Sequence, residues 1–488
     1  MNPLPLFLIL FFCLVSAFAE NYPTYNVNRP YTLRSLDYTP LLYHYHNITL
    51  GDAPQTFFYP QVNPYFRENF QGLLRGINPD WGLEISPVLA FDIRGGKNLG
   101  DTIQGYEGGL FVRGYKDSID FWLDARIFSE GHSSKNPQSW DREFLENQGQ
   151  EWKDLKGEVE YSSYARYRGH FMVRMGWATL DFARDVPHWG PGYYNNLTLN
   201  QGAVPYNQIA LSTKIGPLSV ISLYGDLDAG SHSMSKDVSR NLYGHRYELE
   251  LGNLTLGISE ITVVYDINPY WLFVPIVPLF AEKGNYSEDN NNGAMGFDFN
   301  YRFPVGLRLY SEFFLDDMES PTSLVRNDNI EAKWAWMAGV AYAGNFGEWK
   351  AGTLAEYARM EPYVLSHFEA NTAQIAHLDY PIGLQAGPNS QTINWLLYAK
   401  HKEAFQFQIG QEWAWKGTDY GSEINDITPR DDHYKTSKRF LRDPEGNKVK
   451  MKYRLKPAIS YQAKHFAISS EYSFFNGTEF CSRVMFLW

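Results

Sequence analysis

The sequence lacks a pair of cysteines that could form a disulfide in the mature chain. Its 488 residues include only Cys13 and Cys481. We expect Cys13 to be removed with an N-terminal signal segment, which leaves one cysteine and no intrachain disulfide. An extracytoplasmic chain of this size must then be held together by other means.

The sequence also lacks a second long hydrophobic run. Beyond the N-terminal segment, no stretch reaches the roughly 20 apolar residues of a transmembrane helix, and the mean hydropathy is negative. This excludes a helical membrane protein. It does not exclude a membrane β-barrel, because strands that alternate apolar and polar residues have a polar average.

Positive charge is in deficit, since 43 Lys and Arg stand against 55 Asp and Glu, a net charge of −12. Such a balance argues against nucleic acid as a partner. The sequence contains no Gly-x-Ser-x-Gly, no His-Glu-x-x-His and no phosphate-binding glycine loop, which disfavours the hydrolase and ATPase classes. Asp431-Asp432-His433 could suggest a metal site, but it lies in a highly charged stretch that favours a solvated charge run.

The N-terminus predicts export. Residues 5–18 are almost wholly apolar and end in Ala17-Phe18-Ala19, a small-x-small cleavage pattern before Glu20. This pattern is typical of a signal peptide over residues 1–19. The alternative is an N-terminal membrane anchor, which the short length of the run disfavours.

Alternation with a period of two dominates from residue 83 onward. Leu83, Leu89 and Phe91 share one face of a predicted strand, while Glu84 and Ser86 lie on the other. Aromatic residues make up 16% of the chain, as expected where aromatic girdles mark the membrane interfaces of a barrel. An aromatic-rich soluble β-sandwich is the alternative, and a single strand cannot decide between the two.

The lengths of the connections favour the barrel. Short turns alternate with mostly long loops, as in outer-membrane barrels, with both termini on the short-turn, periplasmic side. The predicted strands are 83–94, 103–115, 118–129, 156–168, 170–181, 207–213, 218–226, 242–251, 254–265, 294–303, 306–316, 332–344, 347–359, 391–401, 403–416, 449–461, 464–475 and 477–488. Short turns are predicted at 115–118, 168–170, 214–217, 252–253, 304–306, 344–347, 401–403 and 462–464, and long connections at 130–155, 182–206, 227–241, 266–293, 317–331, 360–390 and 417–448. The expected fold is therefore all-β: a closed antiparallel transmembrane β-barrel of about eighteen strands over residues 81–488.

The two ends of the mature chain differ in character. The last strand alternates and ends in Phe486 and Trp488, which resembles the sorting signal that the barrel-assembly machinery reads in outer-membrane barrels. Residues 20–80 are rich in proline and do not alternate. They predict a periplasmic or plug segment with a short helix over 65–77, or alternatively a disordered lead-in.

The local motifs resemble the capsule-assembly Wzi family of outer-membrane β-barrels over roughly residues 80–488. The residues that carry the resemblance form four ordered stretches. They are Arg184-Asp185, Trp189-Gly190-Pro191-Gly192, Leu197-Thr198-Leu199-Asn200 and Ala203-Val204-Pro205-Tyr206; His245-Arg246 with Leu256-Gly257-Ile258-Ser259-Glu260; Tyr310-Ser311-Glu312 with Leu315-Asp316-Asp317; and Glu356-Tyr357, Glu361-Pro362-Tyr363, Gly383 and Ala386-Gly387-Pro388-Asn389. The resemblance implies an eighteen-stranded barrel with a lectin-like role, which holds surface polysaccharide without catalysis and without a cofactor.

The loop with the Trp-Gly-Pro-Gly motif is the first candidate site. Gly190, Pro191 and Gly192 predict an irregular turn. The flat rings of Trp189, Tyr193 and Tyr194 could pack on sugars, and Arg184 and Asp185 could bond hydroxyls or carboxylates. The alternative is a loop folded into the barrel as a plug, with Trp189 as its core. Both interpretations can hold together, and Gly387-Pro388 is expected to shape a second loop in the same way.

A group of acidic residues on predicted strands is the second candidate site, and alternation places most of it in the lumen. An enzyme would use Glu312 and Asp316 as a carboxylate pair for glycoside hydrolysis. The favoured alternative is lumenal salt bridging to Arg94, Arg126, Arg166 or Arg302. Asp317 and Glu356 complete the candidate polysaccharide-binding residues.

Three functions follow from these patterns. The first is an outer-membrane lectin that anchors capsular or other surface polysaccharide, in contact with outer-membrane lipid. The second is a diffusion channel or sugar transporter on the same barrel, and the third is an enzyme acting on envelope sugars or lipids. Long loops rich in Trp and Pro favour an occluded barrel over an open pore.

Overall fold

In the computed structural model, most of the described residues lie in β-strands. Within them, nineteen strands form one sheet, and two short strands form a second. No helix among the described residues is long and apolar enough to cross a membrane. The structure describes residues 74–78, 81–96, 103–132, 160–185, 187–200, 203, 205–228, 239–265, 270–275, 279, 291–317, 332–367, 373–378, 380–401, 405–427, 439–462, 466–474 and 478–487.

The strands are long and follow one another in chain order. They are β1 Leu74–Asn78, β2 Trp81–Gly96, β3 Ile103–Lys116, β4 Ile119–His132, β5 Glu160–Arg174, β6 Ala178–Asp185, β7 Tyr206–Ile215, β8 Leu218–Leu227, β9 Arg240–Leu251, β10 Leu254–Tyr265, β11 Asn291–Arg302, β12 Leu307–Asp317, β13 Lys333–Phe346, β14 Trp349–Met360, β15 Ala376–His377, β16 Tyr380–Pro381, β17 Ser390–His401, β18 Phe405–Lys416, β19 Lys452–Gln462, β20 Phe466–Phe474 and β21 Thr478–Leu487, with a 3-10 turn, η2, at Tyr270–Phe273.

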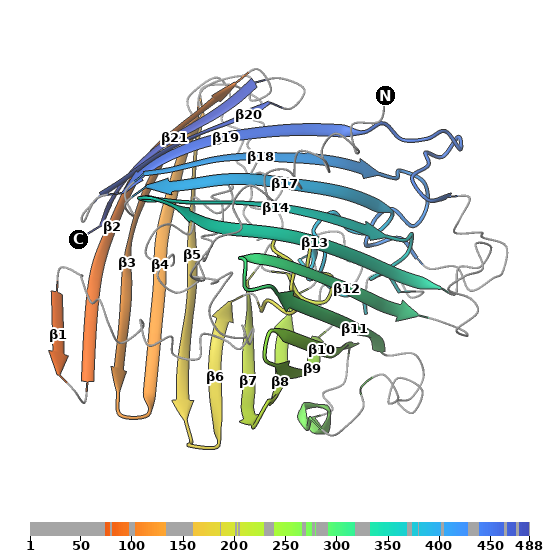
Figure 1. The fold of residues 1–488 in the computed structure, drawn as a ribbon, viewed down its shortest axis with the longest axis horizontal. Helices are drawn as coiled ribbons and strands as arrows, with labels where there is room; N and C mark the ends of the chain where they lie inside the picture. The colour runs from red at the N-terminus through yellow and green to blue at the C-terminus, as the bar shows by residue number, and fades with distance from the viewer. Residues whose placement is uncertain are drawn as a thin grey trace.

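Neighbouring strands pair in an antiparallel ladder. Each strand from β2 to β14 pairs with the next, β14 pairs with β17, and the ladder continues to β21. β21 pairs in turn with β2, where Leu487 lies opposite Val88. The described pairings thus lead from β2 around the sheet and return to β2, with β2–β5 at the left of Figure 1 and β17–β19 across its upper part. The predicted all-β, antiparallel architecture is confirmed.

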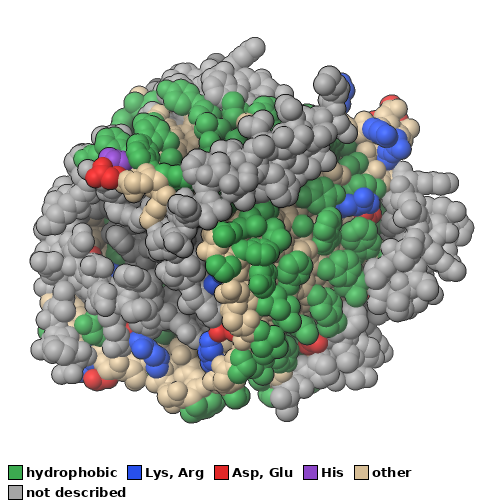
Figure 2. All heavy atoms as spheres, in the orientation of Figure 1, with side chains coloured by type: hydrophobic (Ala, Val, Ile, Leu, Met, Phe, Trp, Pro, Cys, Tyr) green, Lys and Arg blue, Asp and Glu red, His purple; other side chains and the backbone are tan. Residues whose placement is uncertain are grey.

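The two faces of the strands differ as the alternation predicts. On β2, Leu89 and Phe91 are exposed, while Glu84 and Ser86 are buried. The exposed side is apolar around the sheet, and Figure 2 shows a broad patch of hydrophobic side chains on the face that it presents. Exposed apolar residues on strands are what a lipid-facing barrel wall requires.

The inward face of β2–β6 carries buried charged and polar side chains that contact each other. Arg113 Nε donates to Glu84 Oε2 at 2.7 Å. His170 lies 2.7 Å from Asp181 through Nδ1, and its ring stacks on Trp122 with centroids 4.9 Å apart. A buried charge is costly without a partner, so this pairing makes a polar interior compatible with folding.

The predicted turn between β5 and β6 was wrong. A turn was expected at Arg168-Gly169-His170, but β5 runs on to Arg174 and the turn follows at Gly176, where φ is +81°. Gly169 serves close strand packing instead, because a Cβ there would lie 2.7 Å from the carbonyl oxygen of Trp122.

The helix predicted over residues 65–77 is also wrong for the part that can be seen. Leu74–Asn78 is the strand β1, which pairs with the first residues of β2. The remaining residues of that prediction, and the predicted signal peptide, lie outside the described residues. The division into segments 1–19, 20–80 and 81–488 stays a prediction.

The connection lengths generate a test of orientation. Val305 lies in the short turn between β11 and β12, whereas Glu445 lies in the long connection between β18 and β19. We expect a membrane-impermeant maleimide to label Glu445→Cys on intact cells. Val305→Cys should be labelled only after permeabilisation, with both variants made in a Cys481→Ser background. Equal labelling of Val305→Cys on intact cells would reverse the orientation.

Candidate functional site

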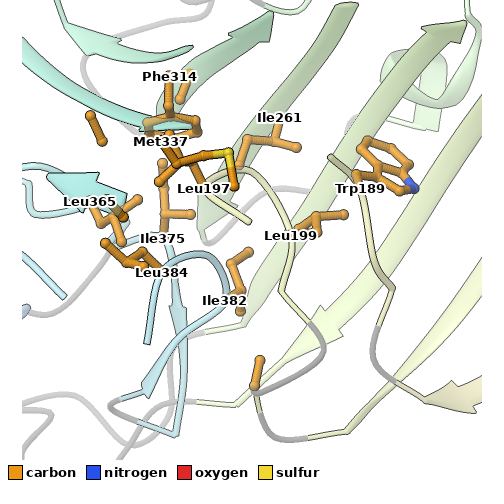
Figure 3. Close-up of a cluster of buried hydrophobic side chains, with 14 of the residues drawn as sticks. Trp189, Leu197, Leu199, Ile261, Phe314, Met337, Leu365, Ile375, Ile382 and Leu384 are labelled. Atoms are coloured by element: carbon orange, nitrogen blue, oxygen red, sulfur yellow. The ribbon is translucent and has the colours of Figure 1, made fainter. Parts of the chain in front are cut away.

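Two long connections fold between the strands and pack against each other. We call residues 187–200, between β6 and β7, the first inner loop, and residues 361–367, 373–378 and 380–389, between β14 and β17, the second inner loop. Figure 3 shows their apolar side chains gathered in one cluster with residues of the strands. The cluster includes Trp189, Leu197 and Leu199 of the first loop, Leu365, Ile375, Ile382 and Leu384 of the second, and Ile261, Phe314 and Met337 of strands β10, β12 and β13.

Trp189 is a core residue of this cluster. Its side chain is fully buried, and its ring packs on β9 so closely that a Cβ on Gly244 would lie 2.9 Å from it. Trp189 also forms an isolated β-bridge with Leu199. Gly190 follows with φ of +116°, a conformation that favours glycine. The Trp-Gly-Pro-Gly motif therefore builds the inner loop, as the plug interpretation predicted.

Glu356 of β14 holds the middle of the first inner loop. The backbone N–H groups of Tyr194 and Asn195 donate to its Oε2 at 2.8 and 3.2 Å, and the N–H of Tyr193 donates to Oε1. The Tyr310 hydroxyl donates to the same Oε1 at 2.8 Å. One buried carboxylate thus satisfies three successive backbone donors that no strand ladder reaches.

Glu312 of β12 likewise accepts backbone N–H groups, from the next turn of the first inner loop. The N–H of Leu197 donates to Oε2 at 2.8 Å. The N–H and the hydroxyl of Thr198 donate to Oε1 at 2.9 and 2.6 Å. Gly190 lies against this carboxylate, because a Cβ on it would be 2.6 Å from Glu312 Oε2.

The first inner loop reaches deep between the strands. Arg308 is the second residue of β12, next to the short turn, and its Nη2 donates to the carbonyl of Pro191 at 2.6 Å. The loop enters from the opposite end of the strands, after β6. Pro191 therefore lies most of the length of β12 away from the end at which the loop enters.

The second inner loop is tied to the first and to the strands. The N–H of Asn200 donates to the carbonyl of Ile382 at 2.7 Å. Asp316 Oδ2 accepts the N–H of Leu365 at 2.8 Å. His377 Nδ1 accepts the N–H of Asp228 at 2.9 Å. Burial, and then the charges of Arg184 and Arg240, lower the pKa of His377 to about 3, so the imidazole is neutral and can accept that bond.

The Gly387-Pro388-Asn389 turn connects the second inner loop to a third connection, between β18 and β19. Lys416 Nζ donates to the carbonyl of Pro388 at 2.6 Å. Asn389 adopts φ of +53°, and its side chain bonds Ser422 Oγ at 2.8 Å and the N–H of Leu441 at 2.7 Å. This motif organises the loop that follows β18.

The remaining predicted site residues are scattered. Arg184 is half-buried, with its guanidinium 4.8 Å from the centroid of the Tyr167 ring, and Asp185 is buried against Arg168 and His170. Asp317 is half-exposed and lies 3.8 Å from Lys333. Phe486 lies on β21. Trp488 and Asp431-Asp432-His433 lie outside the described residues.

The structure changes the interpretation of the carboxylates. Glu312 and Asp316 were weighed as a hydrolytic pair or as salt-bridge partners of arginines such as Arg126. Instead, both accept N–H donors from the inner loops, and Arg126 bonds Asp124 at 2.5 Å. Sequence reasoning missed Asn196, whose Oδ1 accepts the N–H of Gly192 at 2.6 Å. Its place inside a Gly/Pro-rich loop was the available signal, since Asn side chains bond nearby backbone.

Comparison with known proteins shows a match to one protein family. A family described as capsule assembly protein Wzi matches residues 160–381, and this match confirms the resemblance over that range. The solved structure of Wzi from Escherichia coli, an outer-membrane protein described as a carbohydrate-binding β-barrel involved in group 1 capsule assembly, is similar in fold. It is 12% identical with a TM-score of 0.54, over 82% of this chain and 83% of that chain.

Other solved structures match with lower TM-scores. Acinetobacter baumannii OccAB2 is 12% identical over 84% of this chain and 98% of its own, with a TM-score of 0.45. Pseudomonas aeruginosa OccK8 is 8% identical over 83% and 97%, with a TM-score of 0.43. No curated protein sequence matches the chain.

The carboxylate contacts predict a specific loss of loop order. Glu356→Gln and Glu312→Gln each replace an acceptor oxygen by an amide that faces backbone N–H donors. We expect each to destabilise the fold by about 2–3 kcal/mol and to make the first inner loop cleavable by added protease. Urea unfolding of the detergent-solubilised protein and limited proteolysis measure this. Glu445→Gln, at an exposed position in the connection after β18, is the control and should change neither. Unaltered protease resistance in both Glu variants would show that other contacts hold the loop.

The contact between the inner loops predicts a second effect. A Cβ at Gly383 would lie 2.1 Å from the carbonyl oxygen of Leu197, so Gly383→Ala must push the two loops apart. Overpacking of this kind costs about 1–3 kcal/mol. Gly410→Ala is the matched control, because the nearest atom to its Cβ is 3.7 Å away. Equal urea midpoints for the two alanine variants would contradict the close contact.

Proposed function

We propose that this chain, which matches the Wzi capsule assembly family over residues 160–381, is an outer-membrane barrel that binds and anchors surface polysaccharide. The role is lectin-like and non-catalytic. The observation that carries the proposal is the extent of the family match, which spans β5 to β16 and so includes the first inner loop and the carboxylates that hold it.

The barrel part of the proposal rests on the strand pairings. Because β21 returns to β2, we infer a closed barrel of about eighteen strands, in which no sheet edge is left unpaired. The exposed apolar strand faces would contact outer-membrane lipid. We further propose cleavage of a signal peptide near Ala19, and insertion by the barrel-assembly machinery through the terminal strand with Phe486 and Trp488.

Seven of the nine candidate binding residues form two groups under this proposal, and Asp185 and Asp317, which contact Arg168 and Lys333, belong to neither. Trp189, Glu312, Asp316 and Glu356 are buried in contact with the inner loops, so we propose that they shape these loops. Arg184, Tyr193 and Tyr194 are only partly buried, which leaves them as candidates for contact with sugar.

A solute channel on the same barrel is the alternative. The inner loops, packed against strands β7–β14 and clamped by carboxylates, favour an occluded interior. Conductance in planar bilayers separates the two functions, since an open pore conducts and an occluded lectin does not.

Loss of the protein should release polysaccharide from the cell surface. In a deletion strain we expect normal synthesis, but polymer in the medium instead of the cell-bound layer, measured by fractionating cells and supernatant. Long polymers bind through many weak contacts, so retention should respond more than the binding of short oligosaccharides. A deletion strain that keeps its cell-bound layer, together with conductance by the purified protein, would favour the channel.

A variant separates the contact role from the shaping role. Arg184→Ala changes a partly exposed side chain and should weaken retention with unchanged urea stability. Trp189→Ala removes a buried aromatic side chain, which typically costs about 3–5 kcal/mol, and should weaken retention only together with stability. If a variant that combines Arg184→Ala and Trp189→Ala keeps all of its cell-bound polysaccharide, other loops must make the sugar contacts.

A further inference from the structure

Five cations alternate along one stretch of the chain at the start of β19. Lys448, Lys450, Lys452, Arg454 and Lys456 occupy every second position, with apolar or aromatic residues between them. In extended backbone, such residues share one face, about 6.6–6.8 Å apart. A row of five cations therefore spans about 27 Å. We call these residues the cationic strip.

The outer part of the strip lies on an ordered hairpin. Lys448 pairs with Arg442 in an isolated β-bridge, and the N–H of Val449 donates to the carbonyl of Leu441 at 3.1 Å. Lys448 and Lys450 are exposed. The hairpin belongs to the long connection after β18, which is proposed to lie outside the cell.

The inner part of the strip follows the inward face of β19. Tyr453 and Ile459 are exposed on the outward face of this strand, so Lys452, Arg454 and Lys456 point the other way. Their side chains stay accessible: Lys452 is exposed, and the side chains of Arg454 and Lys456 are 38% and 25% exposed. By contrast, inward-facing charged residues of β2–β6 such as Arg113, Asp124 and Arg126 are buried.

The charge balance of the strip differs from the rest of the inward face. Glu412 Oε2 contacts two cations of the strip, at 3.4 Å from Arg454 Nη1 and 3.8 Å from Lys456 Nζ. The arrangement at Arg246 is the opposite, since this one guanidinium bonds both Glu248 and Asp298, at 2.9 and 2.7 Å. Residues 439–456 contain seven Lys and Arg and two Asp and Glu, a surplus of five positive charges in a chain whose net charge is −12.

We propose that the cationic strip binds a polysaccharide whose repeating units carry negative charge, and leads it from the outer hairpin onto the inward face of β19. The proposal rests on the polysaccharide-binding function and specifies an acidic polymer. A neutral polymer gains nothing from a row of cations. A polyanion gains a weak contact at each position, and successive contacts add through effective concentration.

The test uses the full chain in detergent, polygalacturonate as the acidic probe and dextran as the neutral one. Wild-type protein should bind polygalacturonate more tightly than dextran, and this binding should weaken from about 0.05 to about 0.5 M NaCl as charges are screened. Lys448→Gln/Lys450→Gln/Lys452→Gln should weaken polygalacturonate binding about tenfold or more. This variant retains Arg454 and Lys456 with Glu412, so the ion pairs of β19 persist.

A matched control changes the net charge equally at the other end of the strands. Lys116→Gln/Lys214→Gln/Lys350→Gln lies beside short turns and should leave both affinities unchanged. Urea midpoints verify that both triple variants fold.

Three outcomes would overturn the inference. Equal binding of dextran and polygalacturonate, unaffected by the strip variant, would remove the strip and leave the proposed function in place. Equal weakening by the control variant would reduce the effect to net charge. A third outcome combines two results: the protein binds neither polymer at low salt, and its deletion releases no surface polysaccharide. Together these would contradict both the role of the cationic strip and the proposed function.

Discussion

The arrangement of the interior depends on two buried carboxylates that accept backbone N–H groups. A loop that enters the space between strands leaves the ladder, and its N–H donors then need other acceptors. Glu356 and Glu312 supply them for residues 193–195 and 197–198. A carboxylate accepts several bonds with a charged oxygen, and such bonds are about twice as strong as neutral ones. Two side chains on β12 and β14 thereby fix a loop that begins after β6, far away in the sequence.

The inward face uses charge in three different ways around the sheet. On β2–β6, arginines neutralise carboxylates within the wall, as in the pair of Arg113 and Glu84. On β12 and β14, the carboxylates of Glu312 and Glu356 accept hydrogen bonds from loop backbone. On β19, cations outnumber carboxylates and stay accessible. The same alternating pattern thus produces strands whose inward charges pair with each other, strands whose carboxylates bind loop backbone, and a strand with accessible cations.

Period-two alternation explains how much of the fold could be predicted. Inward and outward positions follow from the pleat alone, so the strands and most turns agree with the structure. Glycine was ambiguous: Gly169 has the appearance of a turn residue, but it permits close approach to β4, a tertiary contact that no local pattern encodes. The hydrogen-bond partners of Glu312 could not be predicted from the sequence for the same reason. Alternation predicts that Glu312 faces inward, but it does not predict whether an arginine or a loop N–H will bind its carboxylate.

The fixed conformation of the inner loops could lower the free-energy cost of binding a polymer at the protein surface. Binding is costly where it must first order a loop, and less costly where the loop is already fixed. Asn389 joins the second inner loop to residues 422 and 441, and residue 441 in turn accepts the N–H of Val449 beside Lys448. Hydrogen bonds of Asn389 thus tie the second inner loop, which packs against the first, to the hairpin that carries Lys448. A hairpin tied in this way to a packed loop needs less ordering on binding, which would favour the polymer contact proposed for its cations.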